Sequence, residues 1–414
     1  MLISTVGTVP ADNHRSPALC ATAVLARRPA VVAQPMLDRP GSDADRTGFE
    51  IGWDHAHHRL VPPADHLHAG NPVRQGWEAG QAVFGTRTLQ ATPQVRKWLQ
   101  LRLGAWLRGK AFEPVGVTPA FLKRIAVPVC PITGGLLTQG TGTGSDASVD
   151  RVNNRAGYAV GNLAVMSTHA NRAKSEYDWE DAVGFARQIE RGGLGEIDGL
   201  TAHQWSRLAV LMSFCTPLPH AQAAALPLLV LPPARLRVLN PAQVLQILLT
   251  LRFMQPGQPA RADRLAALFP PALRTPVLML MVSLLSRRIS AGTGARPAAV
   301  QRAMEAAWAE PAILRRWQAV AAALTSAQCE RIVERLVAHR LAPSGWRCLP
   351  LDQATEGWAL ETAGRAASSG EGLDLATDQR SVPAVASPSA LPTPVRSGIR
   401  MRGAATAAGV AWLR

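Results

Sequence analysis

Apolar residues recur at helical spacing through the segment TPQVRKWLQLRLGAWLRGK, which begins at Thr92. Thr92 suits the N-cap and Pro93 suits the first helical position, so we predict that a helix begins here. The same signals at Thr118 and Pro119 predict a short helix over TPAFLKRI. In the longer helix the predicted apolar face contains Val95, Trp98, Leu99, Trp106 and Leu107, and the residues largely off it are Arg96, Lys97, Arg108 and Lys110.

Beyond residue 191 the pattern of apolar positions is helical throughout. We expect about six helices up to residue 342, joined by proline and glycine. The apolar run PVLMLMVSLLS at 276–286 is much shorter than the ~20 residues that span a bilayer, so it predicts a buried helix and no membrane span. The start signals in this region are the capping boxes of Thr201 with Gln204 and of Thr325 with Gln328, and the N-cap Asn240 with Pro241 after it.

Between these helical regions the pattern changes to that of strands. ASVDRV alternates like a short strand, NNRAGYAVG has the composition of a turn, and NLAVMS predicts a second strand. THANRAKSEY then favours a helix. We therefore expect a β-hairpin followed by a helix over 146–176, with Asp150 at the end of the first strand and Asn171 facing it from the helix.

These patterns predict an α+β fold that is mostly α. A small ββα unit is flanked by helices, with an all-helical C-terminal domain and disordered ends. An alternative for the C-terminal tail is a partner-binding segment. The predicted regions are a flexible arm at 1–46, a His-rich loop and basic helical region at 47–112, the ββα domain at 113–190, a helical domain of unassigned role at 191–350, and a disordered tail at 351–414.

The chain is strongly basic. Its 414 residues are 47% hydrophobic, enough for a sizeable core, and carry a formal net charge of +15 with a sequence pI of about 11.0. This charge favours a polyanionic partner, which is nucleic acid or less often an acidic membrane surface; a basic surface without a partner is the alternative. Residues 84–175 hold twelve Lys and Arg against three acids, so their net charge of +9 is more than half of the excess.

The cysteines indicate a reducing compartment. They are odd in number and form no CxxC pair, which argues against a disulfide framework. The N-terminus lacks a basic stretch followed by an apolar core, so we expect no signal peptide and a cytoplasmic protein. The five cysteines are Cys20, Cys130, Cys215, Cys329 and Cys348.

Asp150 and Asn171 offer a carboxylate and an amide oxygen, which are hard ligands. Such a pair suits a Mg²⁺-like ion that keeps several waters and is completed by a phosphate oxygen. Considered alone, one Asp and one Asn are more often a helix cap and a turn residue. Composition therefore leaves both interpretations open.

The segment DRVNNRAGYAVGNLAVMSTHANRAK resembles the HNH endonucleases, whose core is a ββα metal finger. It is similar to a phage and bacterial subgroup with Asp-Arg, Gly-Tyr, Asn and a final Asn-Arg-x-Lys in this order. The resemblance covers roughly residues 128–181 and includes the upstream CPITGGLLT. It implies an endonuclease that hydrolyses phosphodiester bonds in DNA with one Mg²⁺ or Mn²⁺ ion. The alternatives are action on RNA, a weak or inactive DNA-binding derivative, and a helical interaction or effector protein with a vestigial finger.

The resemblance implies a catalytic group of Asp150, Arg151, Asn162 and Asn171, and roles for individual residues. Asp150 matches the acid that binds the metal, and Asn171 matches the helical residue that ligates it. Asn162 matches the middle Asn, which braces the loop by hydrogen bonds. The basic residues expected to contact nucleic acid are Arg172 and Lys174, which match the family's phosphate contacts, and Arg151, Arg155, Arg96 and Lys97.

The chain departs from the zinc-stabilised members of the family. Where these have two CxxC pairs, this chain has Cys130 with Thr133, and Ser167 with Ala170. One thiolate cannot close a four-ligand site, so no structural zinc is expected. We expect packing by Trp179 and Phe185 of the following helix to hold the finger instead.

A second departure concerns the general base. Most of the family have a His after the metal-binding acid, and this chain has Arg151, which stays protonated at pH 7. The similar subgroup also carries Arg at this position. The candidates for the base are then His169, Asp146, or a metal-bound hydroxide acting alone.

One further cluster is WDHAHHRLVPPADHLH, within residues 53–68. Such a density of His and Asp is found in metal sites, but the Pro-Pro break and the lack of helical i, i+4 pairing weaken this interpretation. The alternatives are a contact with the nuclease site and an ordinary polar loop. The residues are Asp54, His55, His57, His58, Asp65, His66 and His68.

Overall fold

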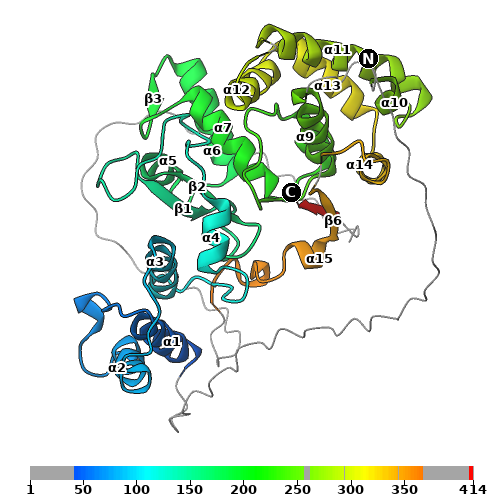
Figure 1. Cartoon of the computed structure of the whole chain (residues 1–414). Coiled ribbons are helices and arrows are strands. Elements are labelled where there is room, and N and C mark those ends of the chain that lie inside the picture. The colour runs from blue at the N-terminus through cyan, green and yellow to red at the C-terminus, as the bar shows by residue number, and fades with distance from the viewer. Residues whose placement is uncertain (1–41, 256–261, 293, 344, 367–409, 414) are drawn as a thin grey trace, which may run out of the picture. The chain divides into compact units, whose positions relative to one another are not determined.

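The structure is a computed structural model that describes residues 42–255, 262–292, 294–343 and 345–366, and the backbone of 410–413 (Figure 1). Helices contain 56% of the residues, and the strands form only small sheets. This confirms that the fold is α+β and mostly α. The helices are α1 (Asp43–His57), α2 (Pro72–Phe84), α3 (Pro93–Leu107), α4 (Pro119–Ile125), α5 (Thr168–Lys174), α6 (Trp179–Gly192), α7 (Ala202–Phe214), α8 (His220–Ala225), α9 (Pro241–Met254), α10 (Ala262–Ala266), α11 (Arg274–Ser290), α12 (Pro297–Trp308), α13 (Pro311–Ala322), α14 (Ser326–Ala338) and α15 (Leu351–Ala354). Short 3₁₀ turns are η1 (Ala64–His66), η3 (Pro271–Leu273) and η4 (Leu360–Thr362).

The strands form three small antiparallel sheets. The first pairs β1 (Ala147–Arg151) with β2 (Leu163–Ser167), and the second pairs β3 (Glu196–Ile197) with β4 (Leu200–Thr201). In the third, β7 (Val410–Leu413) lies between β5 (Arg237–Val238) and β6 (Arg347–Pro350). Only the first sheet carries residues that the sequence predicts for a functional site.

The predicted helix starts are confirmed. The side chains of Thr92 and Thr118 cap α3 and α4, and each helix has proline in its first turn. Thr201 and Thr325 form capping boxes with Gln204 and Gln328. Asn240 occupies the N-cap of α9 without capping it, because its side chain instead bonds the segment 213–218 and Gln243.

Helix α3 buries more of its surface than one apolar face. Leu101 and Ala105 pack with the core beneath β1 and β2, whereas Leu103 packs with Ile51 and Val73 of α1 and α2. The expected face is therefore wrong in part, since Leu107 at its end is 54% exposed. The reason is that α3 packs against both α1 and α4. One apolar face at helical spacing accounts for only one such partner.

Helix α9 is the centre of the helical region. Its residues from Ala242 to Phe253 are all buried, and α8, α11, α12 and α14 contact it (Figure 1). The structure places eight helices, α7–α14, between the described residues 202 and 338, against about six expected. The run at 276–286 lies in α11, where Val277, Leu280 and Leu284 are buried. In the part of the chain that the structure describes, no helix is long and apolar enough to cross a bilayer.

The predicted β-hairpin and helix are present. Strands β1 and β2 pair antiparallel with Asp150 opposite Ala164, and α5 begins immediately after β2 with Ser167 as its N-cap. Figure 1 shows β1, β2 and α5 side by side, and α5 contacts both strands. The hairpin and helix therefore form one unit, with Asp150 on β1 and Asn171 on α5.

The chain ends differ in part from the expected disorder. Residues 1–41, 367–409 and 414 lie outside the described residues, but α1 begins at Asp43 within the expected arm. Within the expected tail, Trp358 is fully buried and its indole Nε1 donates to the carbonyl of Val160 at 3.0 Å. Its own carbonyl accepts from the Gly157 N–H at 2.6 Å. This tail segment thus supports the loop between β1 and β2.

Trp205 of α7 packs against α6 and the segment that follows α5. It is fully buried, its Nε1 donates to the carbonyl of Ile197 at 2.9 Å, and its ring contacts Phe185 at 4.8 Å between centroids. Tyr177 completes this aromatic cluster. Phe185 thus contacts Tyr177 and Trp205, and Trp179 and Phe185 are both partly buried against the core that contains Trp205.

We expect Trp205→Ala to lower the free energy of unfolding by about 3–5 kcal/mol, because it removes a large buried side chain and leaves a cavity. Urea denaturation followed by circular dichroism measures this change. The control is Leu107→Ala at an exposed site, which should change stability by about 0.5 kcal/mol or less. Equal losses in the two variants would contradict the central place of Trp205.

Candidate active site

A cavity of about 430 Å³ lies between α3, β1 and the end of α5. Four residues predicted for the functional site line it, namely Asp150, Arg151 and Asn171 from the hairpin unit and Lys97 from α3. The structure thus brings the predicted carboxylate and amide into one cavity. The other polar side chains that line it are Gln100, Arg108, Ser148, Tyr158, Ser175 and Glu176.

Asp150 is held by the ammonium group of Lys174. The Lys174 side chain is fully buried, and its Nζ lies 2.8 Å from Asp150 Oδ2 and 2.6 Å from Asn154 Oδ1. Asn154 in turn donates to the carbonyls of Ser175 and Tyr177, which follow α5. Lys174 was expected to contact phosphate, but in this position its charge compensates Asp150 inside the protein.

Asn171 is oriented by the neighbouring strand. Its Nδ2 donates to Ser148 Oγ at 3.0 Å, which leaves the amide oxygen for another partner. Ser148 and Asp150 lie two apart on β1, and Asn171 and Lys174 lie three apart on α5, so each pair shares a face of its element. One strand face therefore meets one helix face through two polar contacts.

The donor set fits a hard divalent ion. Lys174 uses only Oδ2 of Asp150, so Oδ1 and the Asn171 amide oxygen remain as protein ligands in the same cavity. Mg²⁺ is commonly bound by one or two protein oxygens, with waters and a phosphate supplying the rest. Among the described residues, no group of three or more His, Cys, Asp or Glu is placed to hold a metal, so an all-protein cage is not formed there.

Asn162 spans the loop between the two strands. Its side chain is fully buried, with Oδ1 accepting from Asn153 N–H at 2.8 Å and Nδ2 donating to the carbonyls of Asn153 and Gly157. Next to it, Gly161 has φ +93° and a Cβ there would lie 2.1 Å from the Arg237 side chain. These contacts keep the loop in one conformation, and with it the end of β1.

Arg151 is buried beneath the cavity. Its Nη1 donates to the carbonyls of Asn154 and Ala156, and its Nη2 lies 3.2 Å from Glu176 Oε1. The guanidinium also lies over the Tyr158 ring at 5.2 Å. Arg151 was expected to touch nucleic acid, whereas here it supports the loop and holds Glu176 at the cavity.

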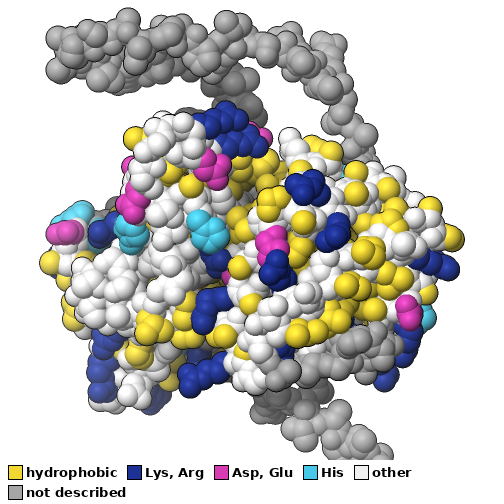
Figure 2. All heavy atoms as spheres, turned by 90° about the horizontal axis from the view of Figure 1, so that it is seen from above, with side chains coloured by type: hydrophobic (Ala, Val, Ile, Leu, Met, Phe, Trp, Pro, Cys, Tyr) yellow, Lys and Arg dark blue, Asp and Glu magenta, His cyan; other side chains and the backbone are white. Residues whose placement is uncertain are grey.

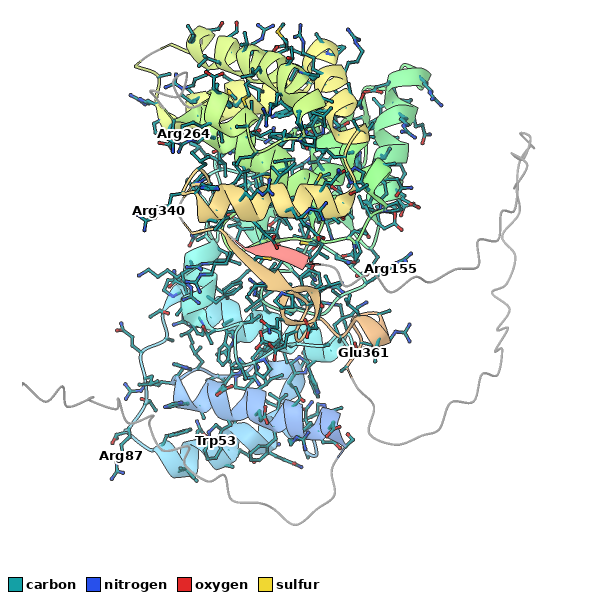
Figure 3. All side chains as sticks on the ribbon, turned by 90° about the vertical axis from the view of Figure 1, so that its right-hand side faces the viewer. Trp53, Arg87, Arg155, Arg264, Arg340 and Glu361 are labelled. Atoms are coloured by element: carbon teal, nitrogen blue, oxygen red, sulfur yellow. The ribbon has the colours of Figure 1, made fainter. Side chains whose placement is uncertain are left out.

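Of the remaining predicted basic residues, three lie at the surface and Lys97 is half-buried. Arg172 and Arg96 are exposed, and Arg155 projects outward with 78% of its side chain exposed, 3.7 Å from Asp178 (Figure 3). Burial lowers the pKa of Lys97, although the nearby Asp146 carboxylate acts in the opposite direction. Figure 2 shows Lys and Arg side chains spread over one face of the molecule among apolar atoms.

The two side chains considered as general base lie elsewhere. His169 is exposed, and its Nε2 is 2.9 Å from the carbonyl of Gly199. Hydrogen bonds from Thr138 and Thr141 lower the pKa of Asp146 to about 2, which makes it a weak base. Neither residue is among those that line the cavity in the described part of the chain.

The positions that match a zinc knuckle come together through hydrogen bonds. The Cys130 thiol donates to Ser167 Oγ at 3.4 Å, and its sulfur accepts from the N–H groups of Ser167 and Thr133. Ser167 Oγ also accepts from the Ala170 N–H at 3.2 Å. Buried hydrogen bonds therefore join the four positions.

The His-rich segment is partly helical. Asp54, His55 and His57 lie in α1, and Asp54 pairs with the buried Arg102 of α3. Burial raises the pKa of the Asp54 carboxyl, although Arg102 acts in the opposite direction. The His57 ring stacks on Phe84 at 4.3 Å. The expectation of one continuous loop is wrong, and none of its described residues lines the cavity.

Sequence reasoning did not identify Ser148, Asn154 or Glu176. Alternation along β1 places Ser148 on the face of Asp150, so this residue could have been found from the pattern. The roles of Asn154 and Glu176 could be found only from the fold. Asn154 bonds Lys174, 20 positions away, and Glu176 bonds Arg151, 25 positions away.

We expect the protein to keep its fold without zinc, because hydrogen bonds already satisfy the knuckle positions. Purified protein should contain zinc well below one ion per chain by elemental analysis. Its urea midpoint should not move when a chelator is added. Stoichiometric zinc that is lost together with the fold would contradict this.

The resemblance to the HNH endonucleases rests on the motif residues between Asp150 and Lys174. Their arrangement in the structure is a hairpin, a braced loop and a helix that meet at one cavity. Compared with known proteins, the chain matches no protein-family model, no curated protein and no solved structure.

Proposed function

We propose that the protein is a divalent-metal-dependent endonuclease of the HNH type that hydrolyses phosphodiester bonds in DNA. The observation that supports this most is the convergence of Asp150 and Asn171 in one cavity with cationic walls. Lys97 and Arg108 line that cavity and supply positive charge for a phosphate. The net charge of +15 agrees with a polyanionic substrate.

The residues have separable roles in this proposal. Asp150 and Asn171 hold one Mg²⁺ or Mn²⁺ ion, which when bound supplies a Lewis acid and lowers the pKa of water. Ser148 and Lys174 orient these two ligands, and Asn162 keeps the loop beside them in place. Arg172, which is exposed on α5 directly after Asn171, neutralises a phosphate outside the cavity in this proposal.

The site differs from an endonuclease site with a histidine base in the groups that could accept a proton from water. Among the described residues that line the cavity there is no histidine, and the carboxylates are Asp150 and Glu176. Glu176 is 64% exposed and lies near the cations of Arg151 and Lys110. We therefore expect cleavage to be slow compared with a site that contains a histidine base.

A second candidate function is DNA binding without cleavage. The observation that favours it is the Lys174 ammonium, 2.8 Å from Asp150 Oδ2, because this cation already compensates the carboxylate charge. A metal ion at Asp150 therefore has an internal competitor. The two candidates predict the same basic surface and differ only in catalysis.

We expect Asp150→Asn to reduce plasmid nicking with Mn²⁺ about a hundredfold or more, because a bound ion stabilises the transition state by several kcal/mol. DNA affinity should hardly change or should rise, since a negative charge is lost. The Asn side chain keeps an oxygen near Lys174, whereas Asp150→Ala leaves a buried charge unpaired and is the harsher variant. Undiminished cutting by Asp150→Asn would show that the site is wrongly assigned.

Arg172→Ala should weaken binding to all sequences and reduce the salt slope of log K by about one unit, if it neutralises one phosphate. Binding to DNA and to RNA at two salt concentrations measures this. Arg302→Ala, at an exposed arginine of α12, is the matched control and should leave the slope unchanged. A wild type that binds with a steep slope but never cuts favours the second candidate.

A further inference from the structure

A second cavity of about 500 Å³ adjoins the one that contains Asp150. Lys97, Gln100 and Val149 line both cavities, so the two lie next to one another at α3 and β1. The second cavity extends from the start of α3 to α4 and the edge of the hairpin. A ligand whose charged part enters the first cavity therefore has room beside it for a further group.

The walls of the second cavity indicate what that group is. Leu122 from α4, Val149 from β1 and Val165 from β2 give it an apolar floor. Amide side chains stand around this floor, supplied by Gln94, Gln100 and Gln139. Among the described residues that line it there is no carboxylate, and its cations are Arg96 and Lys97.

These properties suit a nucleobase. A base has flat faces that gain from apolar contact and an edge of donors and acceptors that a glutamine amide can pair with. The phosphate attached to its sugar needs a cation close by, and Lys97 lies where the two cavities meet. Gln100 accepts from Lys97 Nζ at 3.3 Å, which holds both side chains at this junction. A purely apolar ligand would gain nothing from the donors and acceptors of these amides.

We infer that this second cavity is a nucleobase subsite, which receives the base of a nucleotide next to the phosphate at Asp150. This inference rests on the proposed function, and it specifies the substrate further. A base can enter only when it is unstacked, which costs a few kcal/mol in a duplex and less in a single strand or at a mismatch. The preferred substrate is therefore DNA with unpaired nucleotides.

The test fills the subsite without touching the residues at Asp150. Ala126 lines the second cavity at the end of α4, where it is exposed and its φ of −60° accepts any side chain. Ala126→Phe therefore places a ring in the subsite. Ala120→Phe is the matched control, since Ala120 is exposed on the same helix and does not line the cavity.

Binding is measured on single-stranded oligonucleotides without added metal, so that cleavage plays no part. Each oligonucleotide carries a short duplex at one end, which fixes the register of the single strand. One base is removed at a different position in each, so the loss of affinity reports which base is bound. In the wild type one position should weaken binding about tenfold when its base is removed, because the contacts of that base with the apolar floor and the amides are lost. Ala126→Phe should abolish this position dependence and keep the salt slope, whereas Ala120→Phe should retain both.

The outcomes separate this inference from the proposed function. If the protein binds and cuts DNA but no abasic position stands out, the nucleobase subsite is refuted and the nuclease remains. A position dependence that persists in Ala126→Phe also refutes the subsite. If no oligonucleotide binds at low salt, both proposals fail. A matched duplex bound as tightly as the single strand would contradict the preference for unpaired nucleotides.

Discussion

The buried ammonium group of Lys174 is the interaction on which the geometry of the candidate site depends. Its side chain is inaccessible to solvent, so its charge must be compensated by neighbours, and removing a partner from such a pair costs several kcal/mol. Asp150 compensates the charge and the Asn154 amide oxygen accepts a second hydrogen bond, which ties β1, the loop after it and α5 together. The positions of Asp150 and Asn171 relative to one another follow from this constraint.

The same contact limits what the site can do. Lys174 occupies one carboxylate oxygen, so the protein offers an ion few ligands and leaves the others to water and substrate. Arg151, the residue after Asp150, is directed inward to the loop and to Glu176. We therefore expect a phosphate oxygen of the substrate to serve as a ligand of the ion. The basic walls of the cavity attract the substrate and so favour binding of the ion as well.

The local elements could be predicted from the sequence, and the long-range contacts could not. Thr92 with Pro93 and the alternation around Asp150 are signals carried by neighbouring residues, and the structure contains both elements. The role of Lys174 was not predictable, because a basic residue near a helix end is normally solvated, and only the packing of α5 buries it. Trp358 lies in a segment of disordered composition, and its contact with Val160 joins residues 198 positions apart. The amphipathic pattern of α3 likewise did not show that this helix packs on two sides.

The most direct measurement is the location of Mn²⁺ by anomalous scattering in crystals of the protein with a short single-stranded oligonucleotide. We expect a peak in the cavity, within ligand distance of both Asp150 and Asn171, with a phosphate oxygen at the same ion. A peak at another site would contradict it. So would a bound oligonucleotide whose cavity holds no ion while Lys174 remains paired with Asp150.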